Sequence, residues 1–263
     1  MERIELIHVN KKLGGKEVLK GVDLTLEEGK LYGIIGENGS GKTMLLRLLA
    51  GLIHPDDGEV HYGGKKVKKL TQVVNIGLSI ENIGLYDDMT VYQNMKYYAK
   101  LSGGCDKKKI EETLQRMGLT DRKNMRFAKL SLGLKQKAVL AQAILSSPDL
   151  LLLDEPTNGL DPNQILEIRH LIKSIAEECT VVLSTHILSE VQATCDYIRM
   201  IEQGNMVFSG TVEEFDNYIQ PNTLVVSLGA LPLVADIEAL PGVVRVEELG
   251  GPRFRIQFSD VKE

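Results

Sequence analysis

A glycine-rich segment near the start of the chain, GENGSGKT, joins an apolar run to a leucine-rich run. The apolar run, LYGII, has the composition of a buried strand, and the leucines after the glycines recur at helical spacing. Because glycine has no Cβ, such a segment can curl tightly and direct successive backbone N–H groups inward. The helix that begins there adds its positive end. The sequence therefore predicts a strand, an anion-binding loop and a helix, in that order.

The same segment satisfies the pattern G-x-x-x-x-G-K-[ST], which predicts a loop that binds the phosphates of a nucleotide. Lys42 is expected to reach the β- and γ-phosphates, and the Thr43 hydroxyl to hold Mg²⁺. The residues expected to line the nucleotide are Gly36, Glu37, Asn38, Gly39, Ser40, Gly41, Lys42, Thr43 and Met44. Kinases, GTPases and ATP-driven motors share such a loop, so other motifs must distinguish between them.

A second motif, LLLLDEP, places two acids at the end of an apolar run. A continuous apolar run of this length predicts a strand that is buried on both faces of a parallel sheet. Polar groups at the carboxyl end of such a strand lie where α/β sheets bind ligands. Asp154 is therefore expected to join the Mg²⁺ ligands, and Glu155 to polarise a water for attack on the γ-phosphate.

A third motif, KLSLGLKQK, lies between the first two. Ser131 is a suitable N-cap, and Gly133 leaves backbone exposed at the start of the helix, so this helix start can also receive an anion. Read alone, the motif favours an ordinary capped helix. Its position between the other two motifs favours the binding role.

With these motifs in order over roughly residues 3 to 210, the chain resembles the ATP-binding-cassette (ABC) ATPases, the nucleotide-binding subunits of membrane transporters. GENGSGKT resembles their Walker A motif, LLLLDEP their Walker B and LSLGL their LSGGQ signature. Two further matches follow the Walker B motif. Asn158-Gly159-Leu160-Asp161 resembles the D-loop and Ser184-Thr185-His186 the H-loop.

The resemblance implies a fold and a mechanism. The fold is α/β: a P-loop NTPase (RecA-like) core with an antiparallel β subdomain, an inserted helical subdomain and a small C-terminal α+β extension. Two cassettes are expected to close head-to-tail, so that Ser131 and Gly133 contact a γ-phosphate held by the other protomer. His186 would contact that phosphate, and Asp161 would connect the two sites. Glu155, His186 and Lys42 are the expected catalytic residues.

Four residues, in three motifs, depart from the family pattern. The signature has Leu132 and Leu134 where its first glycine and its glutamine usually stand, as in bacitracin- and lantibiotic-type exporters. Glu81 replaces the glutamine that usually ends the strand before the helical region. It is either a ligand near Mg²⁺ or an ordinary loop acid. Leu13 stands where an aromatic residue usually stacks on adenine, which predicts weak discrimination between ATP and GTP.

The composition limits the remaining possibilities. Lys and Arg total 31 against 36 for Asp and Glu, and a net charge of -5 argues against nucleic acid as a partner. The N-terminus lacks a signal-peptide pattern and no apolar run is long enough to span a membrane, so we expect a soluble, cytosolic protein. The cassette is expected over residues 1–220, with its helical subdomain at about 82–147. A β-α-β-β extension is expected over 221–263.

The leading hypothesis is the ATPase subunit of a bacterial exporter, bound to the cytoplasmic face of the membrane. It would use ATP and Mg²⁺, form a homodimer and drive a separately encoded integral-membrane permease. Residues 81–95 are expected to receive that permease through Tyr86, Met89 and Tyr92, although core packing explains these three equally well. The alternatives are a soluble cassette ATPase without a permease and a regulatory module that binds nucleotide without hydrolysis. The transported substrate is left open.

Overall fold

The computed structural model describes residues 2–80, 85–104, 106–218, 223–227, 234–249 and 253–258. The chain forms two compact units, residues 1–212 and 213–263. Each unit contains its own cluster of buried hydrophobic side chains. The units divide earlier along the chain than the boundary at residue 220 that the sequence predicts.

A six-stranded sheet in the order β10-β9-β3-β8-β7-β6 forms the centre of the first unit. Neighbouring strands from β9 to β6 are parallel, and β10 is antiparallel to β9. The apolar runs around residues 31–35 and 150–153 are buried strands, as predicted. The strands are β3 (Leu31–Ile35), β6 (Ile76–Ser79), β7 (Leu150–Asp154), β8 (Thr180–Thr185), β9 (Tyr197–Glu202) and β10 (Asn205–Thr211).

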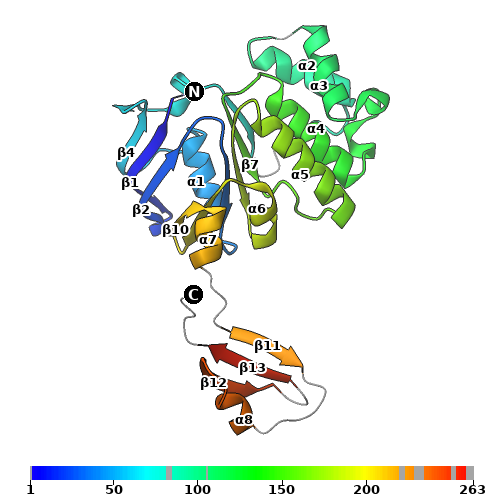
Figure 1. Cartoon of the computed structure of the whole chain (residues 1–263). Helices are drawn as coiled ribbons and strands as arrows, with labels where there is room; N and C mark the ends of the chain where they lie inside the picture. Colours follow the sequence, from blue (N-terminus) through cyan, green and yellow to red (C-terminus); the bar gives the residue numbers. More distant parts are fainter. Residues whose placement is uncertain are drawn as a thin grey trace. The chain divides into compact units, whose positions relative to one another are not determined.

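An antiparallel sheet in the order β2-β1-β4-β5 forms a second layer. Its strands are β1 (Ile4–Leu13), β2 (Lys16–Leu26), β4 (Asp57–Tyr62) and β5 (Lys65–Lys66). Helix α1 (Lys42–Leu49) lies between the two sheets and contacts β2 on one side and β7 and β8 on the other (Figure 1). The leucines of α1 are therefore buried on both sides of the helix.

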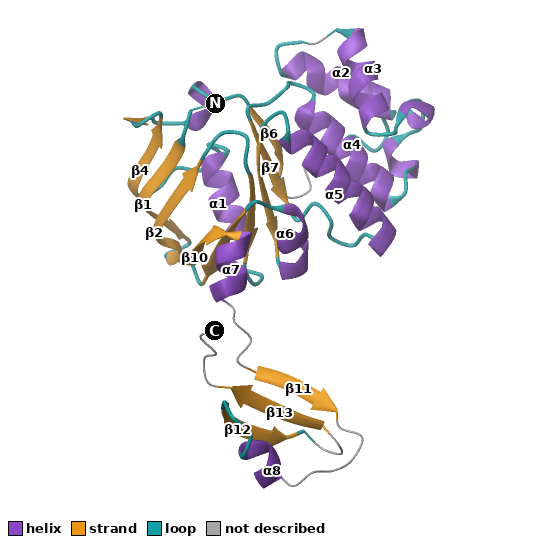
Figure 2. Ribbon diagram, viewed as in Figure 1, coloured by secondary structure: helices purple, strands orange, loops and turns teal. Residues whose placement is uncertain are grey.

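The remaining helices of the first unit are accompanied by 3-10 turns at Leu70–Gln72, Thr120–Arg122 and Phe127–Lys129. They are α2 (Val91–Leu101), α3 (Lys107–Arg116), α4 (Leu132–Ile144), α5 (Pro162–Ala176) and α6 (Leu188–Thr194). Helices α4, α5 and α6 pack on strands of the parallel sheet, on the side opposite α1, while α2 and α3 pack on α4 and fall with it in the region where the sequence predicts helices (Figure 2). Side-chain N-caps start four of these helices: Thr90, Asp106, Ser131 and Asp161. Within the described ranges, no helix is long and apolar enough to span a bilayer.

The hairpin of β9 and β10 and the helix α7 (Val212–Tyr218) were not expected from the sequence. The two residues that join the strands, Gln203 and Gly204, both have positive φ, at 47° and 86°. This is the geometry of a tight two-residue hairpin turn, and a glycine after a polar residue is its usual signal. The Gln-Gly pair within residues 202–205, EQGN, is therefore the sequence signal that predicts this hairpin.

The second unit contains a three-stranded antiparallel sheet in the order β11-β13-β12. Its elements are β11 (Thr223–Ser227), α8 (Val234–Glu238), β12 (Val243–Glu248) and β13 (Arg253–Phe258). Ile237 of α8 is buried with Phe254 and Ile256 of β13, which alternate with exposed arginines along the strand. The predicted β-α-β-β order is confirmed.

Candidate functional site

The register of the parallel sheet brings three segments of the site to one edge. Asp154 pairs with Ser184, and Ser184 pairs with Ile34 on the strand at its other side. The carboxyl ends of β3, β7 and β8 therefore lie next to each other, although they are far apart in the sequence. The glycine loop, the Asp-Glu pair and the Thr-His segment all start from this edge, where α/β sheets bind ligands.

The backbone of the glycine loop requires glycine at several positions. Gly41 has φ 115°, and a Cβ there would lie 2.8 Å from the carbonyl oxygen of Val18. A Cβ on Gly36 would lie 2.2 Å from the carbonyl oxygen of Ile201. Gly39 also has positive φ. The loop is thus packed tightly against β2 and β9, with a curvature that L side chains rarely adopt.

Two side chains of the loop indicate that it can receive an anion. The buried ammonium group of Lys42 donates to the carbonyl oxygens of Gly36 and Glu37, at 2.8 and 3.1 Å, so it lies within the curve of the loop. The Ser40 hydroxyl oxygen is buried and has no hydrogen-bond partner among the described residues. Phosphate oxygens would supply an acceptor for both groups, beside the start of α1.

A hydrogen-bonded chain connects α1 to the ends of β7 and β8. The Thr43 hydroxyl donates to Asp154 Oδ2 at 2.9 Å. The Ser184 hydroxyl donates to the other oxygen of the same carboxylate. A hydroxyl and a carboxylate are the hard oxygen ligands that Mg²⁺ takes together with substrate phosphates, so Thr43 and Asp154 fit the metal predicted from the sequence.

Glu155 lies between Lys42 and His186. Its Oε1 is 3.6 Å from Lys42 Nζ, and its Oε2 is 3.0 Å from His186 Nδ1. Glu155 has φ 48°, an uncommon conformation for a residue other than glycine, and its backbone N–H donates to the Ser184 carbonyl oxygen. We call the set Gly36–Thr43, Asp154, Glu155, Ser184 and His186 the phosphate cluster.

The signature and D-loop residues form a second group, which we call the signature cluster (Ser131–Gly133 and Gly159–Gln164). Ser131 caps α4 by accepting from the Leu134 N–H, and Asp161 caps α5 by accepting from the N–H groups of Asn163 and Gln164. A Cβ on Gly133 would lie 2.8 Å from the Gln164 side chain.

The two clusters are built on different elements. Leu132, which is 52% exposed, approaches Gly159, so the starts of α4 and α5 are neighbours. Helix α4 packs chiefly on α2, α3 and β6, whereas α1 packs on β2, β7 and β8. Among the described residues, the hydrogen bonds of Ser131 and Asp161 stay within their own helices and do not reach the glycine loop.

Of two further residues predicted for the site, Leu13 and Glu81, the structure describes only Leu13. Leu13 ends β1 and is 58% exposed, in a hairpin that continues into β2 next to the glycine loop. Glu81 lies outside the described residues, so its suggested place near Mg²⁺ stays a prediction. Sequence reasoning did not single out Thr157 and Glu190, which form a buried hydrogen bond beside the phosphate cluster.

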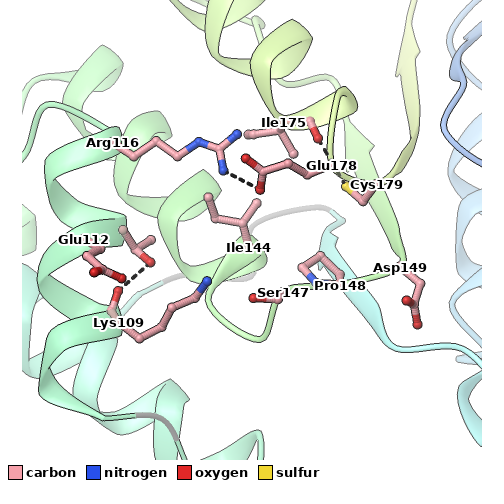
Figure 3. Close-up of a pocket in the computed structure, with 11 residues that line it drawn as sticks. Lys109, Glu112, Arg116, Ile144, Ser147, Pro148, Asp149, Ile175, Glu178 and Cys179 are labelled. Carbon is pink, nitrogen blue, oxygen red and sulfur yellow. Dashed lines mark hydrogen bonds and ion pairs between the residues drawn. The ribbon is translucent and has the colours of Figure 1, made fainter.

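A separate cavity of about 390 Å³ lies among α3, the ends of α4 and α5 and the start of β7 (Figure 3). Arg116 crosses it, donating to Glu178 at 2.9 Å and to the Ser174 carbonyl oxygen. Cys179 lies at its wall, and burial raises the pKa of this thiol to about 11. Because Asp149 and Cys179 precede β7 and β8, the cavity is at the opposite sheet edge from the phosphate cluster.

Comparisons with known proteins agree with this geometry. The model of the ABC transporter family matches residues 19–158, more than half of the chain. The uncharacterized ABC transporter ATP-binding protein YhcH of Bacillus subtilis (strain 168) is 34% identical over 259 residues, covering 94% of this chain and 85% of that protein. The bacitracin transport ATP-binding protein BcrA of Enterococcus faecalis is 37% identical over 215 residues, covering 80% of this chain and 70% of that protein.

A solved structure shares the fold. It is a nucleotide-free ATP-binding cassette from an ABC transporter, with a TM-score of 0.74 and 22% sequence identity. The match covers 82% of this chain and 94% of the chain in that structure. The resemblance inferred from the five motifs is confirmed, including the similarity to bacitracin transport proteins. The chain belongs to the ABC transporter family, as one of its ATP-binding proteins.

Proposed function

We propose that this chain hydrolyses Mg²⁺-bound ATP as a homodimer and thereby drives a separate membrane permease of an exporter. The observation that carries the proposal is the series of contacts from Lys42 through Glu155 to His186 beside the glycine loop. A module that only holds nucleotide would need the loop and its lysine. It would have no need for a carboxylate and an imidazole at the end of the phosphates.

In this mechanism the glycine loop and Lys42 bind the β- and γ-phosphates. Thr43 and Asp154 would hold Mg²⁺, which would supply positive charge beside the phosphate oxygens. Glu155 accepts a hydrogen bond from the attacking water, whose oxygen forms a bond to the γ-phosphorus as the bond to ADP breaks. His186 keeps Glu155 oriented through its Nδ1 and contacts the γ-phosphate. Positioning and charge account for most of the catalysis in phosphoryl transfer.

The separation of the phosphate cluster from the signature cluster supports the dimer. Ser131 and the N–H groups at the start of α4 are suited to an anion, yet they lie on elements away from the glycine loop of their own chain. In a two-fold dimer the same surface of each protomer can serve both sites. The signature cluster of one protomer would then complete the phosphate cluster of the other.

Tyr86, Met89 and Tyr92 are candidates for permease contact. Tyr86 is exposed, while Met89 and Tyr92 are half-buried. Buried Asn94 holds the backbone of Tyr86 at both its N–H and its carbonyl oxygen, so the exposed ring has a fixed base. With relatives described as bacitracin transport proteins, these residues favour an exporter subunit at the cytoplasmic face of the membrane over a cassette ATPase without a permease.

The substitution Glu155→Gln tests the proposed hydrolysis. Gln keeps the shape of the side chain but cannot act as a base, so steady-state phosphate release should fall by about a hundredfold or more. ATP should still bind and should hold the protein as a dimer, measured by light scattering with Mg²⁺ and ATP. Glu177→Gln is the matched control, because the Glu177 side chain is exposed at the end of α5, outside the phosphate cluster and the signature cluster.

Two outcomes would contradict the proposal. Unchanged phosphate release by Glu155→Gln would remove Glu155 from catalysis. Wild-type protein that stays monomeric and inactive with Mg²⁺ and ATP, even when a permease encoded beside its gene is supplied, would remove the function itself. Failure of that permease to co-purify with an active ATPase would instead favour the cassette without a membrane partner.

A further inference from the structure

Glu190 of α6 is a buried carboxylate outside the phosphate cluster, with 4% of its surface exposed. Its Oε2 accepts hydrogen bonds from the hydroxyl groups of Thr157 and Thr185, at 2.7 and 3.1 Å. Its Oε1 lies 3.9 Å from Arg169 Nη2 on α5. A carboxylate at this depth is costly to desolvate unless several donors surround it. Glu190 thus joins three segments of the chain at one point.

The two threonines belong to the two segments that carry the catalytic pair. Thr157 follows Glu155 by two residues, and its backbone carbonyl oxygen accepts from Leu160 in the turn that leads to the D-loop residues. Thr185 precedes His186 directly. The Thr185 hydroxyl donates to Glu190 and also accepts from the N–H of Ile187, at 3.1 Å. The backbone on both sides of His186 is therefore tied to the same carboxylate.

We infer that Glu190 is a positioning residue for ATP hydrolysis: by anchoring Thr157 and Thr185, it sets the placement of Glu155 relative to His186. The 3.0 Å contact between His186 Nδ1 and Glu155 Oε2 joins two segments of the chain. Glu190 anchors each of them through a neighbouring threonine. Among the described residues, the hydrogen bonds and the ion pair of the Glu190 side chain are made with Thr157, Thr185 and Arg169, and not with the two side chains of that contact or with the glycine loop. This inference rests on the proposed hydrolysis at the same site.

The role requires an acceptor at both ends of the side chain. All the polar groups that face Glu190 from Thr157, Thr185 and Arg169 can donate, and the carboxylate accepts from each side. An amide in its place would turn an NH₂ group either toward the hydroxyls or toward the guanidinium. Toward the guanidinium, the NH₂ group sets donor against donor. Toward the hydroxyls, it reverses both hydrogen bonds and leaves the two hydroxyl hydrogens without their shared acceptor. Either orientation weakens an anchor, while the size of the side chain is preserved.

The first measurement is steady-state phosphate release by the full chain with Mg²⁺ and ATP. Glu190→Gln should lower kcat by about tenfold and leave KM within about twofold, because the phosphate-binding loop is untouched. Thr157→Val and Thr185→Val should do the same. The hydroxyl-retaining variants Thr157→Ser and Thr185→Ser should stay close to wild type.

Thr113→Val is the matched control for removing a buried hydroxyl. Thr113 is buried as well, with 4% of its surface exposed. Its hydroxyl donates to the carbonyl oxygen of Lys109 within the same helix, away from the phosphate cluster. It should leave kcat unchanged. A loss in this control equal to that of Thr157→Val would mean that any buried hydroxyl matters, and the inference would be overturned.

A double-mutant cycle separates positioning from simple stabilisation. If Glu190 acts through His186, then Glu190→Gln should cause little further loss of kcat in a His186→Ala background. If the two losses multiply, Glu190 acts independently of His186 and the inference is wrong. An unchanged kcat in the single variant Glu190→Gln, with active wild-type protein, has the same consequence.

Hydrogen exchange gives a readout that does not depend on turnover. In Glu190→Gln the Ile187 amide should exchange faster than in wild type, because its acceptor, Thr185, has lost its anchor. Unchanged exchange at Ile187 would overturn the inference. An inactive wild-type chain would overturn the proposed function, and the Ile187 exchange rate would still report on Glu190, so the two failures can be told apart.

Discussion

Single residues of the glycine loop satisfy two requirements at once. Gly41 must adopt a φ of 115° and must leave room for the carbonyl oxygen of Val18. The next residue, Lys42, is then directed into the curve of the loop, where two backbone carbonyl oxygens hold its ammonium group. The conformation that only glycine tolerates is therefore the same one that places the lysine for phosphate binding.

Leu13 allows a prediction about base recognition. Its exposed side chain ends the hairpin next to the loop and can contact a base only through apolar surface. Wild-type turnover should thus be comparable with ATP and GTP. Leu13→Tyr should tighten ATP binding by about 1 kcal/mol, roughly fivefold, through stacking. Calorimetric titration would measure this.

The control for Leu13→Tyr is Leu101→Tyr, because Leu101 is also exposed but lies at the end of α2, away from the loop. It should not change nucleotide affinity. A strong preference of the wild-type protein for ATP over GTP would contradict the prediction that Leu13 leaves the base poorly distinguished.

Cys179 and Cys195 should react slowly in the folded protein. Burial, followed by the charge of Glu178, raises the pKa of Cys179 from 9.0 to about 11, and burial raises that of Cys195 further. Since the thiolate is the nucleophile, alkylation of Cys179 at pH 7.5 should be about a hundredfold slower than for an ordinary thiol, and should accelerate as the pH rises. Peptide mapping after iodoacetamide treatment would show this. Rapid modification without denaturant would contradict it.

At the scale of elements, the packing of α6 on β3 connects the sheet to the Thr-His segment. Gly33 lies in the middle of β3, and a Cβ there would lie 2.3 Å from Val191 Cγ1 and 2.9 Å from Cys195 Sγ. This close approach lets α6 lie directly on the strand. The same helix carries Glu190, so its position bears on both stability and the site.

Gly33→Ala should therefore lower the free energy of unfolding by about 2 kcal/mol through overpacking. Chemical denaturation would measure it. In the double variant with Val191→Ala, the added methyl group occupies the space that valine vacates. The pair should be about 1 kcal/mol more stable than the sum of the single effects predicts. Strict additivity would mean that the strain arises elsewhere.

At the scale of the whole molecule, one chain contains a phosphate cluster and a signature cluster on different elements. The proposed function needs two chains, each of which contributes one cluster to each site. The second compact unit, residues 213–263, has a separate core of its own, and none of the residues assigned to the two clusters lies in it. Substitutions in the first unit are therefore sufficient to test the proposed dimer.

Mixing two inactive variants tests this arrangement. Lys42→Ala disables the phosphate cluster, and Ser131→Asp keeps a good N-cap but sets a carboxylate against the γ-phosphate. Each variant alone should lack ATPase activity. In a mixed dimer one of the two sites has both defects and the other has none, so an equal mixture should regain roughly a quarter of the wild-type activity.

A second mixture of variants is the control for regained activity. A mixture of Lys42→Ala with Glu155→Gln, two defects of the same phosphate cluster, should regain none, because each site of the mixed dimer keeps one defect. If the first mixture is also inactive while both variants still bind nucleotide, the signature cluster does not act across the dimer.

The sequence alone determined the glycine loop, the buried strands, the capped helices and the order of the motifs, because each depends on neighbouring residues. GENGSGKT needs only its own glycines to form an anion-binding loop, and Ser131 caps a helix that begins beside it. The tertiary structure alone decided which distant residues meet. Sheet register placed Ser184 beside Asp154, and α6 packing on Gly33 brought Glu190 to Thr157, since such contacts depend on how the strands align and no local pattern records them.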